Sequence, residues 1–249
     1  MNKFRADLHV HTVLSPCAEL EMLPPLIISE AMIRGINLIA ITDHNASANI
    51  GAVQQAALGS AVTVLPGIEL QTKEEVHILC LFDTIDQIKT FQQNVDQKMP
   101  SIKNRPDYFG EQLVVDHNGD FIRKEERLLI TSAAISLTEA YNMVEEIGGI
   151  TIPAHINRKA NSLIEILGFV PEEIPFLALE ISRHITTEKA KEKFPQISGY
   201  ELIQNGDVHR LNEFIGSTIF EIENPSIHEI RLALKKVEGR SFTVESNII

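Results

Sequence analysis

The feature of this sequence that most constrains its fold is the alternation of short β-branched runs with segments of helical periodicity. Such alternation predicts βα units around a largely parallel sheet. Pro24 and Pro25 suit the first turn of a helix because proline has no N–H to lose there, and Gly35 suits its end because glycine accepts a positive φ. We therefore expect strands at 5–10, 38–42, 62–66, 150–154, 177–181, 201–203 and 217–222, and helices at 24–34, 49–58, 137–147 and after 225.

The stretch 84–137 interrupts this alternation and predicts an inserted irregular segment. Within it, Asn118-Gly119 lies between two apolar runs, which is a strong signal for a β-hairpin. The chain has no internal repeat, low-complexity tract or linker. A chain of 249 residues that is 44% hydrophobic can bury one full core. We therefore expect a single α/β domain spanning 1–249.

The apolar runs and the cysteines indicate in which cellular compartment the protein is expected. No apolar stretch approaches the roughly 20 residues that span a bilayer, and the N-terminus lacks the apolar core of a signal peptide. We expect a cytoplasmic protein with no membrane partner. Two cysteines are too few for a disulfide framework. Cys80 lies in an apolar run typical of a buried thiol, so only Cys17 is open to chemistry.

The formal net charge of -12 bears on partners. Such a surface repels polyanions, so binding to an extended nucleic-acid duplex, which needs several Lys or Arg on the phosphates, is disfavoured. A small anionic substrate is compatible with this charge, because metal ions bound among carboxylates reverse the local field.

Ionisable side chains fall at or just beyond the ends of several expected strands. In a βα barrel such positions converge on one face, whatever their separation in the sequence. His9 and His11 are two apart in an extended segment, so both rings point to one side, about 6 to 7 Å apart at the backbone. The other members of the set are Asp7, Asp43, His44, Glu69, His155, Asp207 and His209.

Imidazoles and carboxylates together are the ligand set of zinc, iron or manganese, and a carboxylate such as Glu69 can bridge two ions because it has two oxygens. One ion needs about three or four protein ligands, so this larger set predicts more than one ion. Any single histidine at a strand end is more often a hydrogen-bonded surface or core residue. The conjunction of these motifs at successive strand ends favours a metal site.

Five motifs in order along residues 5–240 resemble the PHP (polymerase and histidinol phosphatase) family of metal-dependent phosphoesterases. The resemblance implies a distorted (β/α)7 TIM-like barrel, two to three divalent ions (Zn, Mn or Fe) and hydrolysis of phosphate esters. The motifs are Asp7-Leu8-His9-Val10-His11-Thr12, Thr42-Asp43-His44-Asn45, Pro66-Gly67-Ile68-Glu69, Pro153-Ala154-His155 and Gly206-Asp207-Val208-His209.

Carried over by position, the resemblance implies three groups of ligands. His77 begins the run 76–82 instead of closing a strand, so its role rests on the resemblance alone. The implied groups are His9, His11, Glu69 and Asp207 for the first ion, Glu69, His77 and His155 for the second, and His44 and His209 for the third.

The sequence departs from the family after His11, where members commonly place an Asp or His that completes the third site. Here the stretch reads Ser15-Pro16-Cys17. Cys17 could supply a thiolate ligand, which would favour zinc or iron over manganese. The alternative is a third site that is empty or completed by water.

The implied reaction is in-line attack by a metal-activated water, with Glu69, Asp207 and Arg158 as the catalytic set. Arg158 is the best candidate for holding a phosphate, because a guanidinium binds it with two hydrogen bonds. Arg183, His184 and Arg210 are weaker candidates. Asp7 and Asp43 either orient a ligand histidine or make buried structural hydrogen bonds. Glu180 could be another such orienting group, although a surface salt bridge is the favoured interpretation. His117 and His228 lie outside the site.

The expected substrate is a small phosphorylated metabolite, a nucleotide or an oligonucleotide end, and no oligomeric state is assigned. Against a nuclease, Trp is absent and aromatic residues make up only 6% of the chain. Two alternatives stay open: an amidohydrolase-like C–N hydrolase, which also uses His-x-His at a barrel strand, and a metal-binding regulatory module with weak or no turnover.

Overall fold

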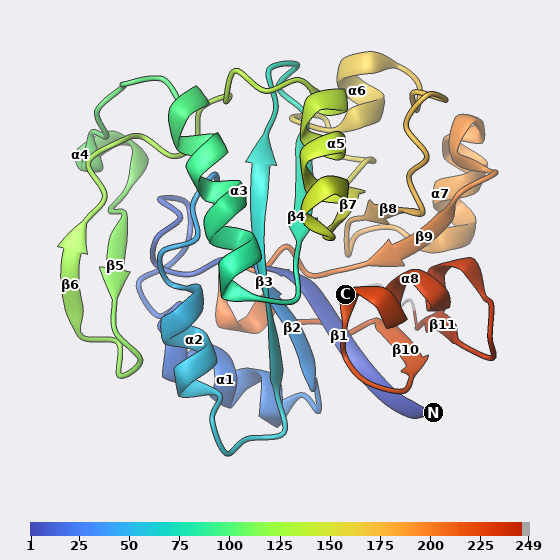
Figure 1. Ribbon diagram of the computed structural model, residues 1–249, viewed down its shortest axis with the longest axis horizontal. Coiled ribbons are helices and arrows are strands. Elements are labelled where there is room, and N and C mark those ends of the chain that lie inside the picture. Colours follow the sequence, from blue (N-terminus) through green and yellow to red (C-terminus); the bar gives the residue numbers. More distant parts are fainter. Residues whose placement is uncertain (246–249) are drawn as a thin grey trace.

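The computed structural model describes residues 1–245 and shows a mixed α/β fold built on one curled, seven-stranded half-barrel sheet (Figure 1). The strands are β1 (Asn2–Val10), β2 (Leu38–Ile41), β3 (Thr63–Gln71), β4 (His77–Leu81), β7 (Ile150–Pro153), β10 (Thr218–Ile222) and β11 (Ser241–Val244). Their order across the sheet is β11-β10-β1-β2-β3-β4-β7.

The sheet is less parallel than the sequence predicts. β1, β2 and β3 run parallel, whereas β4 is antiparallel to both β3 and β7, and β10 is antiparallel to both β1 and β11. The connection from β3 to β4, residues 72–76, is too short for a parallel crossover, which needs about a dozen residues or more.

β3 is also longer than predicted. Its first half pairs with β2 as far as Pro66, and its second half, Gly67 to Gln71, pairs with β4. Glu69 therefore lies inside the strand, and the expectation that it follows the strand is wrong. The long-range pairing with β4 extends β3 past the point where its local apolar run ends.

A separate parallel pair, β8 (Ala178–Ile181) and β9 (Glu201–Gln204), lies between β7 and β1. The N–H of Ile156 donates to the carbonyl of Glu180 at 2.9 Å, and the N–H of His11 donates to the carbonyl of Val208 at 2.9 Å. These contacts tie the pair to both neighbours. Closure into the expected (β/α)7 barrel stays a prediction.

The expected helices form with the expected ends. α5 begins with a capping box between Ser136 and Glu139 and ends at Gly148, which has a left-handed φ of 84°. α1 begins with its two prolines. The helices outside the inserted segment are α1 (Pro24–Ile33), α2 (Ile50–Ala56), α5 (Leu137–Ile147), α6 (Leu163–Leu167), α7 (Thr187–Lys193) and α8 (Ile227–Lys235).

The inserted segment is only partly irregular. It begins with a regular helix, α3 (Ile85–Lys98), capped by Thr84 and Gln87, so the irregular structure expected for 85–98 is wrong. Buried Ile88, Phe91 and Val95 have helical spacing and pack into the core. The expected hairpin is confirmed as β5 (Leu113–Val115) and β6 (Phe121–Lys124), preceded by the short helix α4 (Pro106–Phe109). We call residues 100–129 the arm, which forms the left edge of Figure 1.

A β-bulge in β1 decides which side chains face the site. Asp7 pairs with Ile39 and Val10 with Ile41, so two residues, Leu8 and His9, stand opposite one residue of β2. Strict alternation would place Leu8 and His9 on opposite faces. The bulge lets Leu8 join the apolar cluster inside the curled sheet while the ring of His9 reaches Glu69.

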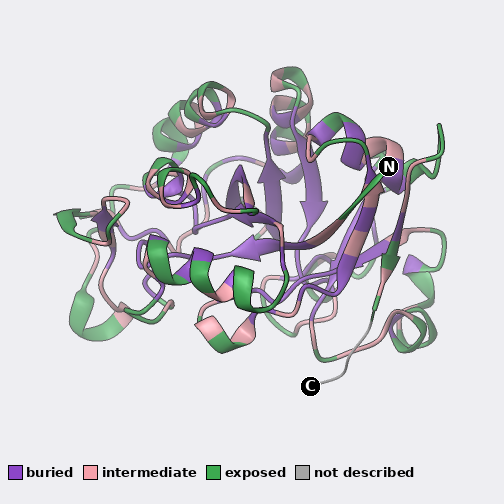
Figure 2. Cartoon of the chain, turned by 90° about the horizontal axis from the view of Figure 1, so that it is seen from below, coloured by how far each residue is buried: buried purple, intermediate pink, exposed green. Residues whose placement is uncertain are grey.

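The central strands of the seven-stranded sheet are mostly buried, whereas the helices expose their outer faces, as the burial colours in Figure 2 show. One apolar cluster lies between sheet and helices, and a second, with Leu8, Leu38 and Leu79, lies inside the curve of the sheet. Within residues 1–245, no helix is both long and apolar enough to cross a membrane.

Candidate metal centre

Glu69 is the centre of the histidine cluster. Its carboxylate is almost fully buried, and two groups of imidazoles surround its two oxygens, as a bridging carboxylate requires. Burial raises the pKa of Glu69, but charge on His77, His9 and His44 holds it well below its usual range. Oε1 of Glu69 lies 2.8 Å from His77 Nδ1, 3.1 Å from His155 Nε2 and 3.3 Å from His9 Nε2. Oε2 lies 2.9 Å from His44 Nδ1 and 3.4 Å from His11 Nε2.

Asp207 joins the same cluster from the loop after β9. Its Oδ1 lies 3.3 Å from Nε2 of both His9 and His11 and 3.4 Å from Nδ1 of His209. Its Oδ2 pairs with Nη2 of Arg158 at 2.5 Å. Asp207 has a φ of 50° and His155 a φ of 31°, left-handed conformations that non-glycine residues rarely adopt. Such strain concentrates at functional sites, because the surroundings must enforce it.

Cys17 also lies at the cluster. Its Sγ is 3.2 Å from His44 Nε2. Burial raises the pKa of the thiol, but charge and hydrogen bonding from His44 and His209 lower it to about 6. The thiol is accessible to solvent although imidazoles surround it on the protein side.

Several buried polar atoms of the cluster make no hydrogen bond of suitable geometry within residues 1–245, although Glu69 Oε2 and Asp207 Oδ2 have close charged neighbours in His44 and Arg158. They are His9 Nε2, His11 Nε2, Glu69 Oε2, His155 Nδ1 and both carboxylate oxygens of Asp207. A buried polar atom without a partner costs about 1–3 kcal/mol, so this concentration of them calls for a ligand. Three groups have ligand atoms within 4.8 Å of one another and can hold an ion: His9, His11 and Glu69; His44, Glu69 and His77; His11, His44 and His209.

Glu180 orients the His9 ring through Nδ1, the ring nitrogen that does not face Glu69 and Asp207. Both of its oxygens lie 3.1 Å from His9 Nδ1, and it also accepts from the N–H of His155 at 2.9 Å and from Asn205 Nδ2 at 2.9 Å. A carboxylate only accepts, so His9 Nδ1 carries the proton and Nε2 is left to coordinate. Glu180 is fully buried, so the surface salt bridge favoured for it is wrong, and its contact with His9 agrees with the alternative of an orienting group.

His11 is oriented through a chain of two hydrogen bonds. Asp43 accepts from Ser15 Oγ at 2.7 Å, and Ser15 Oγ in turn accepts from His11 Nδ1 at 2.9 Å. Asp43 thus acts on a candidate ligand through Ser15, which sequence reasoning missed because no motif marks it. Asp7 instead makes buried structural bonds to the N–H groups of Gly206 and Ile215.

Asn161 is the second residue that sequence reasoning missed. Its Nδ2 lies 3.0 Å from His77 Nε2, and its carbonyl accepts from the N–H of His77 at 2.8 Å. This loop residue belongs to no motif, and its left-handed φ of 54° is visible only in the structure.

The cluster opens into a cavity of about 260 Å³. Arg158 lines it, as the sequence suggests, whereas Arg183 binds Gly206 O and Glu213, and Arg210 pairs with Glu19. His184, expected as a weaker rim candidate, and His228, expected outside the site, are exposed. The lining residues are Cys17, His44, Glu69, His77, His155, Arg158, Ala160, Asn161, Asp207 and His209.

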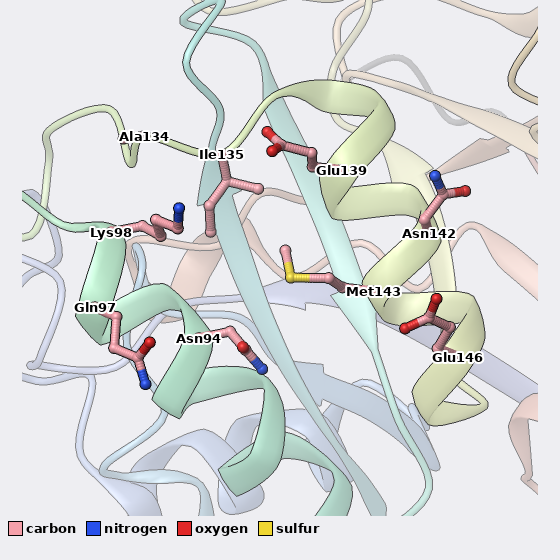
Figure 3. A pocket seen from close by; sticks show the side chains of 9 residues that line it. All are labelled: Asn94, Gln97, Lys98, Ala134, Ile135, Glu139, Asn142, Met143 and Glu146. Atoms are coloured by element: carbon pink, nitrogen blue, oxygen red, sulfur yellow. The ribbon is translucent and has the colours of Figure 1, made fainter.

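A second cavity of about 280 Å³ lies between α3 and α5 (Figure 3). Ile135 and Met143 give it an apolar floor, and Lys98, Glu139 and Glu146 stand at its edge. None of its lining residues belongs to the histidine cluster. Of these two cavities, the one at the histidine cluster is the one lined by candidate metal ligands.

The chain shares its fold with solved hydrolase structures. No protein-family model and no curated protein matches it. The lesion-specific endonuclease Q of Pyrococcus furiosus matches 97% of this chain at 20% identity with a TM-score of 0.69, and the match covers 58% of that longer chain. An amidohydrolase from Chromobacterium violaceum, solved with bound sulfate, matches 93% of this chain and 96% of its own at 20% identity with a TM-score of 0.58.

A third structure, a proposed metal-dependent phosphoesterase from Bifidobacterium adolescentis, matches 82% of this chain and 87% of its own at 18% identity with a TM-score of 0.56. At these identities the likeness concerns the fold. The class that fold and site define is an α/β half-barrel protein with a buried histidine and carboxylate centre able to bind metal ions.

Proposed function

We propose that this protein is a metal-dependent hydrolase of phosphate esters with a distorted (β/α)7 barrel of the PHP type. The observation that carries the proposal is the convergence of six imidazoles on Glu69 and Asp207, with buried ligand atoms that lack hydrogen bonds within residues 1–245. The structural likeness to an endonuclease and to a proposed phosphoesterase supports the same class.

The residues divide into the sets that would hold the ions. Glu69 lies close to His9 and His11 of the first proposed site and to His77 and His155 of the second, so it would bridge these two sites. The proposed ligands are His9, His11, Glu69 and Asp207 for one ion, Glu69, His77 and His155 for a second, and His44, His209 and Cys17 for a third. Bound divalent ions, of zinc, manganese or iron, would lower the pKa of water and neutralise phosphoryl oxygens.

Arg158 holds the phosphate in this proposal. Its side chain is 39% exposed in the cavity, and it pairs with Asp207 Oδ2. A divalent ion at Asp207 would compete for that carboxylate, and the guanidinium is then free to form two hydrogen bonds with a phosphate. Glu180 and the Ser15–Asp43 pair keep the Nδ1 protons of His9 and His11 in place.

Cys17 distinguishes the proposed third site. Its Sγ lies 3.2 Å from His44 Nε2, and a thiolate ligand favours zinc or iron over manganese. Substitution with serine should lower the number of zinc ions bound. Metal analysis of wild type and Cys17→Ser tests this, and equal zinc content would exclude the thiolate as a ligand.

Two other functions remain as outcomes of the same test. The likeness to an amidohydrolase favours C–N hydrolysis as the second candidate, although the bound sulfate in that structure shows a tetrahedral anion on the same fold. A regulatory module would bind metal without turnover. A small phosphate ester, a nucleotide and an oligonucleotide end are the substrates we propose to compare.

The deciding experiment measures phosphate release from phosphomonoesters, phosphodiesters and short oligonucleotides, and amide cleavage in parallel, with manganese, zinc or iron. Glu69→Gln is the negative control, because the amide keeps the volume and loses the bridging charge. We expect ester hydrolysis that Glu69→Gln abolishes. Amide cleavage alone would support the amidohydrolase, and metal binding without any turnover would support the module.

A further inference from the structure

One end of the arm presents aromatic side chains that have no role in the core. None of the four side chains of α4 is buried, and Tyr108 is 74% exposed. Phe109 packs edge-on against Tyr108 with ring centres 4.7 Å apart. The guanidinium of Arg105 lies over both rings, 5.2 Å from the centre of Tyr108 and 5.9 Å from that of Phe109. The three residues form a preassembled unit that we call the aromatic platform.

The platform is anchored to the loop that carries Cys17. A Cβ on Gly110 would stand 2.1 Å from the carbonyl oxygen of Pro16, so the two backbones are in close contact. Asn104 Nδ2 donates to the Gly110 carbonyl at 2.9 Å, which braces the turn after α4. In Figure 1, α4 lies at the end of the arm toward which β3 points, the same end that carries Glu69. The platform therefore flanks the cavity side of the molecule.

Arg105 and Lys103 are cations that make no ion pair or side-chain hydrogen bond within the described part of the chain. The other cations of the arm are neutralised: Arg123 by Glu125, Lys124 by Glu111, and Arg127 by Asp96. Of these two cations, Arg105 is the one that lies over the rings of Tyr108 and Phe109. The rings and this guanidinium together match a ligand that has both a flat ring and a phosphate.

We propose that Tyr108 and Phe109 bind an unpaired nucleobase of the substrate by stacking, with the guanidinium of Arg105 facing its phosphate. Every base has a π face, so such stacking tolerates different sequences. The platform needs a base free of its partner, as in a single strand, a strand end or a free nucleotide. The inference deepens the proposed function, and it rests on that function for the reaction.

Binding is tested with the full chain as purified and a fluorescent, cleavage-resistant phosphorothioate oligothymidylate, followed by fluorescence anisotropy. Base stacking on an aromatic side chain contributes about 1–3 kcal/mol, so Tyr108→Ala should raise the Kd about 5- to 150-fold. Tyr108→Phe keeps the ring and should bind nearly as wild type. Phe121→Ala removes a side chain of similar exposure on the same arm, and should leave the Kd unchanged.

A strand of the same length without bases separates stacking from charge. It should bind weakly to wild type and be insensitive to Tyr108→Ala, whereas Arg105→Gln should weaken binding of both strands. Equal effects of Tyr108→Ala on both strands, or an effect no larger than that of Phe121→Ala, would overturn the proposal. Thymidine monophosphate in competition reports whether a free nucleotide suffices, since its binding should show the same Tyr108 dependence.

Turnover separates this inference from the proposed function. If the protein hydrolyses base-free phosphate esters with equal rates in wild type and Tyr108→Ala, and oligonucleotides with a raised KM only in the variant, both proposals hold. Unchanged oligonucleotide kinetics in Tyr108→Ala would refute the platform and leave the hydrolase intact. Tyr108-dependent binding without hydrolysis of any ester would leave the platform and refute the hydrolase.

Discussion

Replacing Glu180 with glutamine tests whether a residue behind the metal centre sets its affinity. The carboxylate accepts from three donors, on His9 Nδ1, the His155 N–H and Asn205 Nδ2. Glutamine can keep the acceptor at one oxygen position, but its NH2 group then faces a donor at the other. Asn205 cannot turn to accept without releasing the N–H of Leu8, which its Oδ1 holds at 2.9 Å.

The expected loss of stability follows from the one donor that glutamine leaves without an acceptor. One buried donor without an acceptor costs about 1–3 kcal/mol of folding stability. For a chain of this size each kcal/mol lowers Tm by about 2–4 °C, so the metal-free variant should melt about 2–12 °C below wild type. Loss of the negative charge behind His9 makes Nε2 a weaker ligand, and changes of this kind lower metal affinity about 10- to 100-fold.

The assay is zinc binding by competition with a chelating dye, together with thermal unfolding of the metal-free protein. Glu173→Gln is the matched control, because Glu173 is an exposed glutamate and its substitution should change neither quantity. A Glu180→Gln variant that binds zinc as tightly as the control would refute the argument that Glu180 prepares His9 for coordination.

Three further predictions concern protonation and packing. Burial lowers the pKa of His9 and His44, but neighbouring carboxylates raise both pKa values well above the usual value, so a metal ion must displace protons from these rings. Metal affinity should therefore rise with pH, and calorimetry in buffers of different ionisation enthalpy should show proton release on binding. Because the Cys17 pKa is lowered to about 6, the alkylation rate of Cys17 in the metal-free protein should be half-maximal near that pH, and bound zinc should protect the thiol. Buried Cys80, whose pKa is raised, should not react. Gly206→Ala would place a Cβ 2.4 Å from the Glu213 carbonyl oxygen and should cost about 1–3 kcal/mol in thermal or urea unfolding, whereas Gly199→Ala, with open space around it, should be neutral.

Features set by neighbouring residues could be predicted. The prolines at the start of α1, the capping box of α5 and the Asn-Gly hairpin act over a few residues, so their signals are readable in the sequence. α3 carried equally local signals, a capping box at Thr84 and helical spacing, but its irregular flanks led to the wrong prediction. Most candidate ligands were readable because they belong to short motifs; His77 and Cys17 belong to none of them.

Features that depend on distant partners could not be predicted. β3 is extended by its pairing with β4, which places Glu69 inside a strand, and the bulge opposite β2 turns His9 toward it. The sequence leaves Glu180 open between a surface salt bridge and an orienting group, and only the fold brings it to His9.

The sequence by itself determined which chemistry this chain can carry, since imidazoles, carboxylates and a thiol are fixed covalently at their positions. It also determined most helices, because capping and helical spacing act within a few turns. Tertiary structure alone decided how these groups share space around Glu69, which residues orient them, and where the aromatic platform lies. The physical reason is that pairing register, bulges and burial arise from contacts between segments far apart in the chain, and no local pattern records them.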